Sequence, residues 1–128
     1  MQLISPTEYV TRATRAMETA TTRIYLLSMV IADHEKTHTL ITALENAAKR
    51  GVEVIGVSID SQFSHNAWRN TPVNEGGIGP VKYTLVADTK HEICQAYDVE
   101  HPEAGVAFRG SFLIDKEGQV RHQVVNDL

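Results

Sequence analysis

The sequence has a single cysteine, no excess of basic residues and no apolar run long enough for a membrane span. Cys94 cannot pair within the chain, so a disulfide framework is excluded and we expect the reducing environment of the cytoplasm. The 12 Lys and Arg against 16 Asp and Glu give a net charge of −4. Nucleic acid and anionic membranes both bind basic faces, so we expect neither as a partner. The longest apolar run, residues 24–32, is about half a membrane span.

The overall composition is that of one globular domain. Of the 128 residues, 42% are apolar. A chain of this length removes on the order of two-thirds of its unfolded surface from water, so it folds without a disulfide or a structural metal. We therefore expect one domain over residues 1–128 and no cofactor.

The first half of the chain predicts a parallel strand–helix–strand unit. Residues 5–8 form a capping box that begins a helix. Residues 24–31 are almost entirely apolar, which is typical of a central strand covered on both faces. A helix over residues 33–50 then ends at Gly51 in the left-handed conformation, and residues 52–58 form the next strand. The apolar stripe of that helix is predicted to be Leu40, Ile41, Leu44, Ala47 and Ala48.

The second half continues the alternation of helices and strands and ends in a hairpin. Gly118 supplies the positive φ that the hairpin turn needs. The pattern as a whole predicts an α/β fold, a three-layer sandwich with helices on both faces of a mixed sheet. The predicted elements are a helix over 63–70, a turn-rich loop over 72–80, a strand over 83–87, a helix over 89–97 and hairpin strands over 107–114 and 119–124.

Several blocks after residue 50 match one protein family in the right order. They are GVEVIGVSIDS (51–61), SHNAW (64–68), GGIGP (76–80), GVAFRGSFLID (105–115) and VVNDL (124–128). On these blocks residues 51–128 closely resemble the typical two-cysteine peroxiredoxins of the alkyl hydroperoxide reductase/thiol-specific antioxidant family. The resemblance implies a thioredoxin-like fold and, for an intact site, antioxidant reduction of a small-molecule peroxide.

The catalytic part of the family pattern is missing. The resemblance implies a peroxidatic cysteine in a Pro-x-x-x-Thr-x-x-Cys stretch at the start of the helix after the first core strand. Here that stretch falls on residues 28–35 (SMVIADHE), which contain no Cys, Thr or Pro. The sequence also ends before the tail that carries the resolving cysteine in relatives. We therefore expect an inactive scaffold in which Arg109, which matches the family's active-site arginine, is vestigial.

The first 50 residues resemble a different family. Residues 20–31 and 41–54 are similar to the first strand–helix–strand unit of phospholipase D-like proteins. The catalytic His-x-Lys-x4-Asp signature of that superfamily is incomplete, because Ile41 stands at the aspartate position. Our hypothesis is an engineered or recombined chimera, joined near residues 50–54.

Two alternatives give the chain an enzymatic function. In the first, Cys94 acts with Arg109 as a thiol peroxidase; against this, an unpaired cysteine is among the most buried residue types. For Arg109 we favour an ion pair, for example with Asp60 or Asp115, over the alternative of a residual anion or peroxide site. In the second, residues 34–38 fit the His-Glu-x-x-His motif of zinc hydrolases. No third ligand follows at the required spacing, so we interpret His34 and His38, with Glu35, as surface side chains.

The remaining predictions concern the other histidines and the last strand. Trp68 is expected in core or interface packing. We expect a homodimer, because the strand over residues 119–125 lies where peroxiredoxins pair strands between subunits and its exposed valines need a cover. The histidines expected to be solvated or hydrogen-bonded are His65, His91, His101 and His122, and the valines are Val120, Val124 and Val125.

Overall fold

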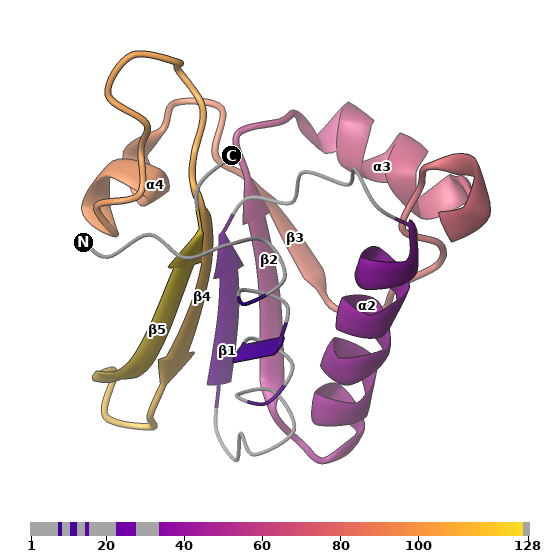
Figure 1. Ribbon diagram of the computed structural model, residues 1–128, viewed down its shortest axis with the longest axis horizontal. Helices are drawn as coiled ribbons and strands as arrows, with labels where there is room; N and C mark the ends of the chain where they lie inside the picture. The colour runs from indigo at the N-terminus through magenta and orange to yellow at the C-terminus, as the bar shows by residue number, and fades with distance from the viewer. Residues whose placement is uncertain (1–7, 9–10, 13–14, 16–22, 28–33, 127–128) are drawn as a thin grey trace.

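The computed structural model describes residues 8, 11–12, 15, 23–27 and 34–126 (Figure 1). Side chains of residues 23–27, 34–38 and 40 are outside this description. The described residues 8, 11, 12 and 15 are helical, and Glu8 pairs with Arg12 one turn later at 2.6 Å. The predicted capping residue Ser5 lies outside the described residues.

Five strands form one mixed sheet in the order β3-β2-β1-β4-β5 (Figure 1). β1 is the central strand, as its apolar run predicts; it pairs in parallel with β2 and antiparallel with β4. The bounds are β1 Arg23–Leu27, α2 His34–Lys49, β2 Glu53–Ser58, α3 Gln62–Asn70, η1 Val73–Glu75, β3 Thr84–Ala87, α4 Glu92–Ala96, β4 Arg109–Ile114 and β5 Val120–Asn126.

The two faces of the sheet bury two separate apolar clusters. Side chains alternate along each strand, so β2 sends Val54 to one cluster and Val57 to the other, and β5 does the same with Val124 and Val125. The first cluster includes α2 and the loop around Ile78, and the second includes α4 and the segment that follows it. The predicted three-layer sandwich is therefore confirmed.

The helix α2 ends as predicted but buries a slightly different stripe. Gly51 takes the left-handed conformation at φ +87°. Ile41, Leu44 and Ala47 are buried, whereas the predicted stripe residue Ala48 is exposed and Ala43 is buried instead. The side chain of Leu40, the remaining predicted stripe residue, lies outside the described part of the structure.

The helix predicted over residues 89–97 is shorter in the structure. It begins only at Glu92, because His91 adopts a left-handed backbone with φ +62° that cannot belong to a right-handed helix. Residues 88–91 form a turn instead, closed by the amide of His91 donating to the carbonyl of Asp88 at 3.0 Å.

The GGIGP segment is a turn, as predicted. Gly76 and Gly79 have left-handed φ values of +91° and +70°. Gly77 lies so close to the end of α3 that a Cβ built on it would be 2.0 Å from the Thr71 carbonyl oxygen. No side chain fits at that position.

The edge strand β5 carries a bulge. Leu113 faces His122, but Ile114 faces Val120, so Arg121 is an extra residue on β5. Val120 is 47% exposed, whereas Val124 and Val125 are 3% and 4% exposed. The prediction that all three valines need an external cover is wrong for the last two, because the two sides of the sheet already bury them. Within the described residues no helix has the length and apolarity needed to cross a membrane.

Candidate functional site

Arg109 lies at the carboxyl end of the central strand. It is the first residue of β4, and the next residue, Gly110, faces Leu27, the last residue of β1. On its other side Arg109 faces Asn126 of β5. Residues 28–33, which follow β1, are outside the described part of the chain.

The side chain of Arg109 is half-buried, and its Nε atom is buried without a hydrogen-bond partner among the described residues. The two carboxylates considered as ion-pair partners have other contacts. Asp115 accepts from Arg121 Nε at 2.6 Å, and Asp60 accepts from Ser58 Oγ at 3.1 Å. The guanidinium therefore keeps donor capacity that the described fold does not use.

Asn126 presents a second unused polar group at the same end of the sheet. Its side chain is fully buried, and neither Oδ1 nor Nδ2 has a hydrogen-bond partner in the described structure. Residues directly opposite on antiparallel strands project from the same face, so Asn126 and Arg109 share one face. Buried polar groups without partners are costly and rare in native proteins.

Cys94 is buried inside the second apolar cluster, as predicted. It lies in α4, is 1% exposed and belongs to the same cluster as Val99 and Phe112. Its thiol donates to the carbonyl oxygen of His91 at 3.4 Å. Burial, together with the neighbouring carboxylates of Asp88 and Glu100, raises the pKa of the Cys94 thiol to about 11. A thiol in such surroundings is protonated near neutral pH and a poor nucleophile.

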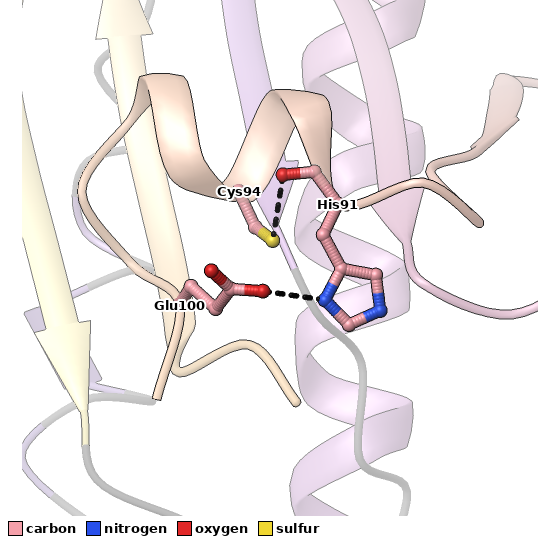
Figure 2. A group of neighbouring side chains, drawn as sticks. All are labelled: His91, Cys94 and Glu100. Atoms are coloured by element: carbon pink, nitrogen blue, oxygen red, sulfur yellow. Dashed lines mark hydrogen bonds and ion pairs between the residues drawn. The ribbon is translucent and has the colours of Figure 1, made fainter. Parts of the chain in front are cut away.

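The structure brings His91 and Glu100 to this thiol (Figure 2). His91 Nδ1 lies 2.6 Å from Glu100 Oε1, and one donor atom of each of the three residues lies within 4.8 Å of the others. The hydrogen bond from His91 holds the pKa of the Glu100 carboxyl below its usual value. Sequence reasoning missed this cluster; the His91-x-x-Cys94 spacing was its only local signal.

The carboxylate of Asp88 fixes the position of α4. It is 5% exposed and accepts from the backbone amides of Ile93 and Cys94 at 3.1 and 2.9 Å. The amide of Asp88 donates to the carbonyl of Ser58 at 2.7 Å, which joins this turn to the end of β2. Asp88 thus caps the amino end of α4, although it lies four residues before the first residue of the helix.

His65 is a hydrogen-bonded core histidine. It is 5% exposed, its Nε2 lies 2.6 Å from Ser58 Oγ, and its ring centroid is 5.3 Å from that of Trp68. Burial lowers the pKa of His65. The Ser58–His65 pair is not a catalytic triad, because Nδ1 has no partner within the described residues and Asp60 contacts the serine instead.

The other predicted positions do not join a site in the described structure. His101 Nδ1 accepts from the amides of Glu103 and Ala104, and His122 is exposed. His34, Glu35 and His38 lie in α2, and their side chains are outside the described residues. The zinc-hydrolase reading of that motif stays a prediction.

Comparison with known proteins decides the family. The model of the AhpC/TSA family matches residues 33–123. The chain belongs to the AhpC/TSA family. The match begins at residue 33 and so includes α2, whereas the sequence blocks alone begin at Gly51. The resemblance of the first residues to phospholipase D-like proteins, and with it the chimera, stays a prediction.

Curated relatives are named alkyl hydroperoxide reductase C or peroxiredoxin. The chain is 58% identical over 80 residues to alkyl hydroperoxide reductase C of Buchnera aphidicola subsp. Schizaphis graminum, which covers 62% of the chain and 40% of that protein. It is 50% identical over 84 residues to peroxiredoxin-2 of Rattus norvegicus, covering 66% and 42%. The chain spans about two-fifths of the length of these relatives.

Solved structures confirm the thioredoxin-like fold. Plasmodium yoelii thioredoxin peroxidase I aligns with a TM-score of 0.69 at 39% identity, covering 81% of this chain and 61% of that one. The mitochondrial 2-Cys peroxiredoxin of Plasmodium falciparum aligns with a TM-score of 0.71 at 34% identity, covering 89% and 68%.

Replacing Asp88 tests how Cys94 is buried. In Asp88→Ala two amides of α4 lose their acceptor, so we expect the free energy of unfolding to fall by about 1–2 kcal/mol. Local opening of α4 should accelerate labelling of Cys94 by a disulfide reagent roughly 5–30-fold, and loss of the Asp88 carboxylate should add to this because that loss lowers the thiol pKa. Glu92→Ala, an exposed change in the first turn of the same helix, should change both quantities less than Asp88→Ala does. Wild-type labelling as fast as in denatured protein would contradict the buried thiol.

Proposed function

We propose that this chain is a peroxiredoxin-family scaffold without peroxidatic thiol chemistry of its own. The observation that supports it is the state of Cys94, the one sulfur nucleophile in the sequence. The thiol is 1% exposed and its pKa is raised to about 11. At pH 7 roughly one molecule in ten thousand would then carry the thiolate that attacks a peroxide.

The position that the family uses for its nucleophile supports the same proposal. That position falls on residues 28–35, where no residue is a cysteine. Arg109, which the resemblance matches to the family's active-site arginine, lies at the carboxyl end of β1. An arginine there can bind and polarise an oxygen substrate, but without a thiolate nothing attacks the O–O bond.

A peroxide-consumption assay tests the proposal. Wild-type protein and Cys94→Ala, each with hydrogen peroxide or cumene hydroperoxide and dithiothreitol, should both consume peroxide at the rate of reductant alone. Near-ultraviolet circular dichroism checks that the variant keeps the fold. Turnover that requires protein and disappears in Cys94→Ala would establish the alternative, a thiol peroxidase acting through Cys94 with Arg109.

A second candidate function is anion or peroxide binding at Arg109. It is favoured by two polar groups on one face of the sheet, the Arg109 guanidinium and the Asn126 amide, with buried atoms that have no partner among the described residues. A ligand with several acceptor oxygens would satisfy the guanidinium through charge-assisted hydrogen bonds.

Sulfate is a suitable probe of this candidate. At ten times its Kd it should raise the melting temperature by about 5 °C, above the effect of chloride at equal ionic strength. Arg109→Gln should lose this difference. Arg121→Gln, which removes an exposed arginine of β5, should keep it. Equal sulfate responses in the two variants would refute the anion site.

We also propose that the chain forms a homodimer. β5 is an edge strand of the described sheet, with Val120 exposed on it, and an unpaired edge favours pairing with a second chain. Light scattering should give twice the mass of the 14.2 kDa chain. Val120→Lys should shift the mass toward the monomer, whereas the hairpin-turn change Lys116→Ala should not. A wild-type monomer at all concentrations would exclude the dimer.

A further inference from the structure

Three side chains with metal-binding atoms converge beside α4. His91 precedes the helix, Cys94 lies within it, and Glu100 follows it on the segment that bridges to Ala107. Figure 2 shows the imidazole and the carboxylate directed toward each other, with the sulfur beside them. One donor atom of each residue lies within 4.8 Å of the other two. The three residues lie within ten positions of one another in the sequence. Small rotations of their side chains would change the distances between the three donor atoms.

The spacing is close to that of a tetrahedral metal site. Zinc bonds of about 2.0–2.3 Å to nitrogen, sulfur and oxygen place neighbouring ligand atoms roughly 3.3–3.7 Å apart. His91 Nδ1 and Glu100 Oε1 are now joined by a hydrogen bond of 2.6 Å. An ion that inserts between them needs these two atoms to separate by about 1 Å. Both side chains are partly exposed, at 24% and 30%, so the solvent side of the cluster can open.

The donor set selects the class of metal. A thiolate, an imidazole and a carboxylate together suit borderline-soft divalent ions such as Zn²⁺ better than Mg²⁺ or Ca²⁺, which prefer oxygen ligands alone. Cys94 would bind from the buried side and the other two from the solvent side. Three protein ligands leave a fourth position for water or a small ligand.

We propose that His91, Cys94 and Glu100 form a binding site for one zinc-class divalent ion. On binding, the thiol proton leaves for solvent and the hydrogen bond from Cys94 to the His91 carbonyl is lost. The proton that Nδ1 of His91 shares with Glu100 moves to Nε2, or to solvent if Nε2 is already protonated, and two bonds to the metal replace this hydrogen bond. The site involves neither Arg109 nor residues 28–35, but it shares Cys94 with the proposed function, so its test measures bound metal and not peroxide consumption.

The bound ion would stabilise the short helix α4. Its ligands lie before, within and after the helix, so the ion joins the segment around Glu100 to the turn at His91. Ligands of this kind are not preassembled in the unfolded chain, and the binding free energy therefore favours the folded state.

Metal binding to the full chain tests the proposal. Chelator-treated protein is titrated with ZnCl2, and with CoCl2 as a spectroscopic probe, and bound metal is measured after dialysis. We expect one ion per chain, a rise in melting temperature, and a thiolate-to-cobalt charge-transfer band with tetrahedral d–d absorption. Because metal-loaded activity is not measured, the result is distinguishable from that of the peroxide assay.

Variants separate this site from the histidine pair of α2. Cys94→Ala should lose the charge-transfer band, and Glu100→Gln, a change at a partly exposed residue, should weaken zinc binding by at least about a hundredfold. The double change His34→Gln and His38→Gln should leave affinity and spectrum unchanged, as should His122→Gln. No retained ion in wild type, or an ion lost in the α2 double variant and kept in Glu100→Gln, would overturn the proposal.

Discussion

The carboxylate of Asp88 is the contact on which the region around Cys94 depends. It accepts from two amides of α4, while its own backbone amide is bonded to the end of β2. A five-residue helix has too few internal hydrogen bonds to be stable alone. The fixed carboxylate supplies the missing acceptor and anchors the helix to the sheet. The direction of the Cys94 side chain into the apolar cluster follows from this anchoring.

The same arrangement raises the pKa of the Cys94 thiol and holds its sulfur beside two other possible metal ligands. A carboxylate near a buried sulfur raises the thiol pKa, because a second negative charge in a poorly solvated position is unfavourable. A divalent cation reverses that balance, since it compensates both charges. The proposed lack of peroxidatic reactivity and the proposed metal site are thus compatible with one electrostatic environment.

Local sequence signals were sufficient for most of the fold. The left-handed Gly51 and Gly118, the apolar run of β1 and the alternation of strands and helices each depend on neighbouring residues, and the structure confirms them. The blocks after Gly51 also indicated the AhpC/TSA family correctly, whereas their match of Arg109 to the family's active-site arginine stays a prediction.

The cluster around Cys94 could not be predicted in the same way. It requires a left-handed His91, which is uncommon for a residue with a Cβ, and a second left-handed residue, Asp98, that turns the chain back toward Glu100. Neither conformation has a strong local signal. The left-handed His91 is also why the predicted start of α4 is wrong. A second reason is that the capping carboxylate comes from Asp88 and not from the residue next to the helix.

The bulge at Arg121 limits how a second chain can add to β5. A bulge bends its strand and increases the local twist, and here it also places a cation beside the edge. An incoming strand therefore finds regular backbone for pairing over residues 122–126, and beyond the bulge it can contact the exposed side chain of Val120. Fibrillar stacking of many chains requires a long, flat edge, so this short usable stretch favours a closed pair over open-ended growth.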